Sequence, residues 1–211
     1  MGSNFSAVIE HNLRNKNSLE KFLEDLISRT DLFPTIHKLT NHENDQWEWI
    51  RELDIPISFG IQMTSWVKDL KRKVEEAKLQ KRYKYSNVWE ELISEDRLEL
   101  SGPDSILEMK FNIHILELYS YIRWRSFLMD METQSILRNV CKELCSYFDT
   151  NYCIYMSDEF CATDSIYEGK SMSQYREELM RRFGQSKQTI DDMYIKLEDS
   201  WTTEGYFIEY F

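Results

Sequence analysis

Residues 151–184 read NYCIYMSDEFCATDSIYEGKSMSQYREELMRRFG, and this stretch decides the fold class. Its first part, 152–156, is a short apolar run that predicts a buried strand. Its last part predicts a helix over 173–183. Ser171 and Gln174 form the S-x-x-Q pattern of a capping box ahead of this helix, and Gly184 follows as its C-terminal cap. A strand, a loop and a helix in succession indicate a fold that combines both kinds of element.

Three further segments have a clear periodicity. Residues 55–63 and 206–211 alternate apolar with polar or small side chains, which predicts two strands with one buried face. Residues 133–148 carry apolar side chains at helical spacing, which predicts an amphipathic helix. In the two predicted helices, we expect five side chains to be mostly buried: Leu137, Val140, Leu144, Leu179 and Phe183.

The remaining segments complete a predicted α+β (or mixed α/β) fold. Residues 1–54 are predicted to be mainly helical, with Ser18 capping a helix over 19–27, and residues 65–82 predict another amphipathic helix. Residues 106–128 fit both periodicities, and their β-branched and aromatic content favours strands. We therefore expect one domain over 1–211, with a small mixed β-sheet, helices packed on it and a helical N-terminal third.

Composition and charge narrow the possible functions. The chain has 211 residues and a net charge of −11, which repels nucleic-acid phosphates and anionic membranes and attracts basic partners. No window of 18 uncharged apolar residues is present, and the N-terminal residues contain no apolar run typical of a secretion signal. We therefore expect a cytoplasmic protein that contacts neither nucleic acid nor membrane.

The four cysteines have a spacing that does not suit a metal. Cys141, Cys145, Cys153 and Cys161 follow the pattern C-x3-C-x7-C-x7-C, which differs from the paired C-x2-C spacing of zinc sites. We expect reduced, metal-free cysteines that act as small buried apolar side chains, and we expect no cofactor.

Three carboxylates follow the strand predicted at 152–156. Asp158, Glu159 and Asp164 lie where α/β enzymes often place catalytic groups, but no histidine or second motif accompanies them in the sequence. The Gly-Lys-Ser at 169–171 resembles the end of a P-loop, yet Asp164 occupies the position of its first glycine, so nucleotide binding is not predicted. No catalytic residue is assigned.

The last third of the chain is strongly acidic. Residues 149–211 contain thirteen acidic and six basic side chains, a net charge of −7, with tyrosines and a tryptophan among them. Carboxylates steer basic partners, and Tyr and Trp are favoured as interface anchors, although part of this aromatic set is equally suited to the core. The predicted binding residues are Asp158, Glu159, Asp164, Tyr167, Tyr175 and Trp201.

The second half of the chain resembles a known class of bacterial proteins. The residues that carry the resemblance are RWRSFL at 123–128, NYCIYMSDEF at 151–160, YEGKSMSQYREELMRRFG at 167–184 and GYFIEYF at 205–211. They are similar to small immunity proteins encoded beside polymorphic toxins. The resemblance implies a non-catalytic cytosolic protein that binds a toxin and blocks it, here by occluding a basic toxin domain. A small enzyme using the 158–164 carboxylates and a regulatory domain of a larger assembly remain the alternatives.

Overall fold

The centre of the protein is an antiparallel β-sheet. The structure, a computed structural model, describes residues 4–13, 16–40, 57–63, 106–157, 162–193 and 205–211. Seven strands of these residues pair in the order β2-β3-β4-β5-β1-β6-β7, and each neighbouring pair is antiparallel. The strands are β1 (Asn4–Glu10), β2 (Ile36–Thr40), β3 (Ile57–Met63), β4 (Ile106–Phe111), β5 (Ile115–Arg123), β6 (Tyr152–Ser157) and β7 (Phe207–Tyr210).

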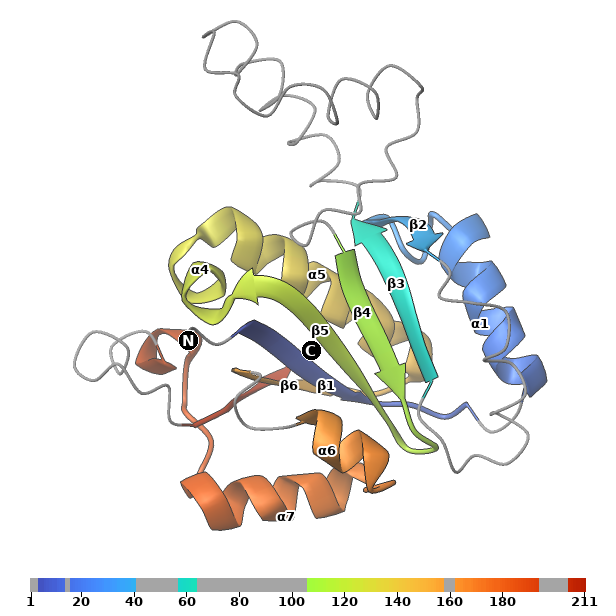
Figure 1. Cartoon of the computed structure of the whole chain (residues 1–211). Coiled ribbons are helices and arrows are strands. Elements are labelled where there is room, and N and C mark those ends of the chain that lie inside the picture. Colours follow the sequence, from blue (N-terminus) through green and yellow to red (C-terminus); the bar gives the residue numbers. More distant parts are fainter. Residues whose placement is uncertain (1–3, 14–15, 41–56, 64–105, 158–161, 194–204) are drawn as a thin grey trace, which may run out of the picture.

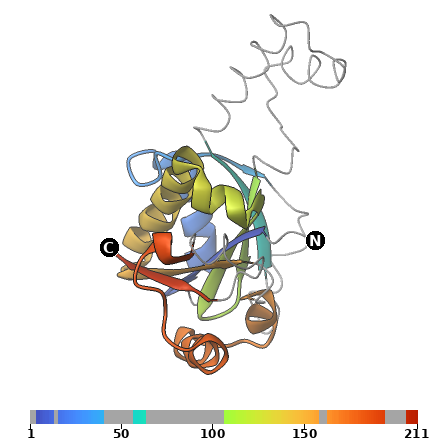
Figure 2. The same cartoon turned by 90° about the vertical axis from the view of Figure 1, so that its left-hand side faces the viewer.

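Helices cover both faces of the sheet. In Figure 1, α4 and α5 lie on one side of the sheet and α6 and α7 lie together below it, and Figure 2 shows the same separation from the side. Buried side chains of α1, α4 and α5 form the larger core against one face, whereas those of α6 and α7 form a smaller core against the other. The helices are α1 (Lys16–Ser28), α4 (Trp124–Met129), α5 (Met131–Phe148), α6 (Ala162–Tyr167) and α7 (Met172–Phe183).

Strand β1 joins the two cores. It lies between β5 and β6, and successive side chains of a strand point to opposite faces of the sheet. Phe5, Ala7 and Ile9 therefore belong to the larger core, and Val8 belongs to the smaller one. Both faces of β1 are covered, so residues 5–9 are all buried.

The structure confirms the α+β class and most of the predicted elements. Strands β3 and β7 lie within the predicted strands at 55–63 and 206–211, and β6 matches 152–156. Helices α5 and α7 match 133–148 and 173–183, and α7 has the predicted capping box and C-terminal glycine. The ambiguous segment 106–128 forms β4 and β5 and then enters α4. Residues 55–56 and the helix predicted at 65–82 lie outside the described residues.

The predicted burial pattern is largely correct. Leu137, Val140, Leu144 and Leu179 are buried, as their helical spacing predicts. Phe183 is only half-buried. It is the last residue of α7, where the Arg182 guanidinium lies 5.2 Å from the centre of its ring, and it packs against the border of the smaller core.

The N-terminal segment differs from the prediction of a mainly helical region. The described part of residues 1–54 contains two strands, β1 and β2, on either side of one helix. Helix α1 begins at Lys16, so Ser18 lies inside its first turn and not at the position before the helix. Strand β1 was missed because a strand buried on both faces shows no alternation of apolar and polar residues.

The sheet is also larger and more uniform than expected. A small mixed sheet was predicted, whereas the described strands form a seven-stranded sheet in which all neighbouring strands are antiparallel. The parallel contact that the described residues contain is a single bridge between Lys187 and Phe207. Chain segments that return along the sheet without a crossover helix produce antiparallel neighbours, as in the β4–β5 hairpin.

A carboxylate on α5 holds the segment that follows α1. Glu143 accepts hydrogen bonds from the Thr35 hydroxyl at 2.5 Å and from the Thr35 backbone N–H at 3.4 Å. Burial raises the pKa of Glu143, and the bonds from Thr35 partly oppose this rise. A carboxyl with a higher pKa in the folded chain binds its proton more tightly there. Its contribution to stability is therefore lost as the pH rises through that raised pKa.

Replacing Glu143 by glutamine should consequently change the pH dependence of stability. We expect Glu143→Gln to gain thermal stability relative to the wild type as the pH rises from about 4 to about 7, because the buried carboxylate no longer ionises. Thermal unfolding of both proteins across this range measures the difference. Glu24→Gln, at an exposed position of α1, is the matched control. A difference between Glu143→Gln and wild type that stays constant with pH would contradict this account.

Candidate functional site

The six predicted binding residues do not gather on one described surface. Asp158, Glu159 and Trp201 lie outside the described residues. Asp164 is exposed in the first turn of α6, and Tyr167 is the last residue of that helix. Of these residues, the structure therefore places only Asp164 on an exposed surface.

Tyr175 is a core residue and not a surface anchor. Its side chain is 1% exposed, and its hydroxyl donates to the Met156 sulfur at 2.7 Å. It lies three residues after Met172 and four before Leu179, and the three together form the inner face of α7. This helical spacing was present in the sequence and indicated burial, so assigning Tyr175 to an interface was wrong.

The acidic charge of the last third is not concentrated on its described part. The described residues of 149–211 carry eight acidic and five basic side chains, a net charge of −3 out of −7. Over the whole chain the described residues carry eighteen acidic and fourteen basic side chains, a net charge of −4 out of −11. Acidic and basic side chains are thus nearly balanced among the described residues. Most of the excess negative charge belongs to residues outside them.

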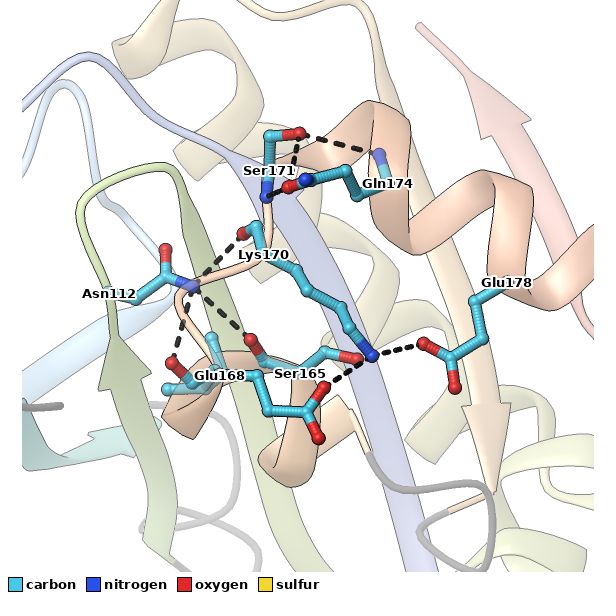
Figure 3. A network of polar contacts seen from close by, with 8 residues as sticks. Asn112, Ser165, Glu168, Lys170, Ser171, Gln174 and Glu178 are labelled. Atoms are coloured by element: carbon cyan, nitrogen blue, oxygen red, sulfur yellow. Dashed lines mark hydrogen bonds and ion pairs between the residues drawn. The ribbon is translucent and has the colours of Figure 1, made fainter.

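Some of these carboxylates are also paired within the fold. Lys170, between α6 and α7, makes ion pairs with Glu168 at 2.5 Å and with Glu178. The hydrogen bonds that Lys170 donates to Glu168 and Glu178 raise the pKa of Lys170. Figure 3 shows Lys170 between these two carboxylates, beside the Ser171–Gln174 capping box. Glu168 and Glu178 therefore stabilise the α6–α7 corner.

Asn112 connects this corner to the sheet. It lies in the turn between β4 and β5, and its side-chain oxygen accepts from the backbone N–H groups of His114 at 2.7 Å and Ile115 at 2.8 Å. Its side-chain NH₂ points at the end of α6, where it meets the carbonyls of Ser165, Ile166 and Lys170 at 3.5, 3.4 and 3.1 Å (Figure 3). The Ser165 and Ile166 carbonyls also accept from the backbone N–H groups of Lys170 and Gly169. One side chain thus stabilises the hairpin turn and links it to the end of α6.

A second polar group anchors β7. The Arg138 guanidinium of α5 binds the Glu209 carboxylate, with both oxygens 3.0 Å from its Nε. The buried Tyr155 hydroxyl donates to the same carboxylate at 2.9 Å. The hydrogen bonds to Glu209 raise the pKa of Arg138. Beyond this anchor, Tyr210 and Phe211 are 63% and 42% exposed.

The described cysteines are buried thiols. Cys141, Cys145 and Cys153 lie in the larger core without disulfides, and burial raises the pKa of the Cys145 and Cys153 thiols. A thiol whose pKa is raised is a weak nucleophile. Cys161 lies outside the described residues. Among the described residues, no group of three or more His, Cys, Asp or Glu side chains is arranged to hold a metal ion.

Three comparisons with known proteins found no match. No family model, no curated protein and no solved structure matches it. In the described parts of the chain, no helix has both the length and the apolar character needed to cross a membrane.

The sequence analysis did not identify the residues that hold the α6–α7 corner and β7 in place, which are Asn112, Arg138 and Glu209. Asn112 interrupts an apolar run with a residue type typical of turns, which was a usable signal for a hairpin between 111 and 115. Arg138 and Glu209 are 71 residues apart in the chain, and no local pattern connects them. Their pairing follows from strand order, which brings β7 beside β6 and opposite α5.

Proposed function

We propose that this protein is a cytoplasmic binding protein that recognises a basic partner protein, in the manner of an immunity protein that occludes a toxin domain. The observation that carries the proposal is the net charge of −11. A charge of this size accelerates association with a basic protein by about 10- to 10³-fold. The partner is then held by contacts at short range, because charge acts mainly on the association rate.

The described fold suits a rigid binding partner. Two cores fix the sheet from both faces, and the polar groups at the α6–α7 corner and at β7 are committed to internal bonds. A surface held in this way loses little conformational entropy on binding. Asp164 lies exposed on α6, where a basic surface can approach it.

Co-expression with the product of the adjacent gene tests the proposal. We expect that product to arrest growth when it is expressed alone, and to bind this protein and permit growth when the two are expressed together. The purified pair should form a stable complex whose association rate falls with added salt. An adjacent product that is harmless, or that does not bind, contradicts the immunity role.

Charge reversal should slow association with that partner. We expect the triple variant Asp158→Lys, Glu159→Lys and Asp164→Lys to lower the association rate about tenfold at low salt and to flatten its salt dependence, with a smaller change in dissociation. Stopped-flow association at several salt concentrations measures both effects, and circular dichroism checks the fold.

A matched control makes the charge test specific to this segment. Glu10, Glu24 and Glu132 are exposed on β1, α1 and α5, and reversing all three changes the net charge by the same amount. A position-specific role requires the first triple variant to associate more slowly than this control. Equal rates for the two variants would remove the 158–164 segment from recognition.

A further inference from the structure

His11 joins the end of β1 to the turn between β4 and β5. It directly follows the last residue of β1 and is only 4% exposed. Its backbone N–H donates to the His114 carbonyl at 3.1 Å, and its ring nitrogen Nε2 lies 2.8 Å from the Asn112 carbonyl oxygen. The other ring nitrogen, Nδ1, accepts from the Leu13 backbone N–H at 3.2 Å. One imidazole ring therefore bonds to the hairpin turn and to the segment that follows β1.

These two bonds define the protonation state of the ring. A carbonyl oxygen can only accept, so Nε2 carries the hydrogen that is donated to Asn112. A backbone N–H can only donate, so Nδ1 carries no hydrogen where it accepts from Leu13. The folded chain therefore holds His11 as the neutral tautomer with its hydrogen on Nε2.

A second proton on this ring breaks one of the two bonds. It binds at Nδ1 and turns that atom into a donor that faces the Leu13 N–H, so the bond to Leu13 is lost. The bond from Nε2 to Asn112 remains, because Nε2 donates in both forms. The ring centres of Phe111 and Phe148 lie 5.5 and 5.8 Å from that of His11, and an apolar environment of this kind disfavours a charged ring. Protonation therefore acts on Leu13 and leaves the hairpin turn in place.

The charged side chains on the neighbouring elements give a charged ring little support. Glu10 on β1 and Asp149 after α5 are exposed, so water weakens their attraction for a charge on His11. Lys110 on β4 points to the face of the sheet opposite the larger core, since successive side chains of a strand alternate. His114, the other titratable residue of the hairpin turn, is half-buried. The neutral ring is thus the form that suits its surroundings.

We propose that His11 is a pH-sensitive switch, which holds Leu13 in the larger core when its ring is neutral and releases Leu13 when its ring is charged. Leu13 is 8% exposed and belongs to the larger core. The folded chain favours the neutral ring, so the stability that this contact contributes is present at neutral pH. It is lost as the pH falls below about 6.5, the ordinary pKa of a histidine side chain. This inference does not depend on which partner the protein binds.

NMR spectroscopy of the wild-type protein tests the switch directly. We expect the ring nitrogen signals of His11 at about pH 7.5 to show a hydrogen on Nε2 and none on Nδ1. Between about pH 7.5 and about pH 5, the protection of the Leu13 amide against hydrogen exchange, corrected for the intrinsic rate at each pH, should fall about tenfold. The amide of His11, which bonds to His114, should change less than about twofold.

Asparagine at position 11 separates the hydrogen bond from the titration. His11→Asn supplies a side-chain oxygen that can accept from the N–H two residues further on, and it binds no proton in this pH range. We expect the protection of Leu13 in this variant to be nearly the same at both pH values. His114→Gln removes the half-buried histidine of the same hairpin turn and is the matched control, which should keep the tenfold change of the wild type.

The outcomes are decisive even where a variant is unstable. A hydrogen on Nδ1 at neutral pH, or a wild-type Leu13 amide whose protection does not change with pH, overturns the switch. A tenfold fall that persists in His11→Asn, or one that His114→Gln abolishes, assigns the pH dependence to another group and also overturns it. If His11→Asn does not fold, the wild type decides alone, because equal falls at the Leu13 and His11 amides would show a general loss of stability and contradict the proposal.

Discussion

Replacing Phe5 by alanine is expected to lower the free energy of unfolding by about 3–5 kcal/mol, the range typical of a fully buried phenylalanine. Phe5 is 0% exposed at the middle of the sheet. Its ring centre lies 4.7 Å from that of Phe127, 6.2 Å from Tyr155 and 6.4 Å from Trp124. The variant leaves a cavity where β1, α4 and β6 meet, and rings this large cannot move far enough to fill it.

Urea unfolding of Phe5→Ala and the wild type measures this loss. Phe183→Ala is the matched control, because it removes the same side chain from a half-buried position at the end of α7. We expect the control to lose about 1 kcal/mol. Equal losses for the two variants would show that β1 does not form the centre of the larger core.

The second large effect is expected at Asn112. Asn112→Ala should lower the free energy of unfolding by about 2–4 kcal/mol, since it removes a hydrogen-bond partner from partly buried backbone groups on both sides of the side chain. The N–H groups of His114 and Ile115 lose their acceptor in the hairpin turn. The Lys170 carbonyl, just after α6, loses its donor, whereas the Ser165 and Ile166 carbonyls keep the backbone N–H groups of Lys170 and Gly169.

Asn112→Asp separates the two contributions. Aspartate keeps the acceptor for the hairpin turn, but it places a carboxylate against the carbonyls at the C-terminal end of α6, where negative charge is unfavourable. We expect a loss of about 1–3 kcal/mol, with faster amide exchange first at Gly169 and Lys170, whose N–H groups close the last turn of α6. An Asn112→Asp protein as stable as the wild type would mean that the link to α6 contributes nothing.

The elements that the sequence predicted correctly are those with a local signal. Helix α7 has its capping box, its inward-facing Leu179 and its closing Gly184 within fourteen residues, and each depends only on near neighbours. Helix α5 and strands β3 and β7 likewise have apolar side chains at regular spacing, because one face of each element packs against a core. Helix α6, which carries the exposed Asp164, was not predicted.

The α+β class, the helices with clear periods and caps, and the large negative charge could therefore all be read from the sequence. Tertiary structure alone decided that β1 lies between β5 and β6, because a strand buried on both faces has no local period. It also decided that Arg138 meets Glu209. These features depend on strand order and register, which arise from contacts between residues far apart in the chain.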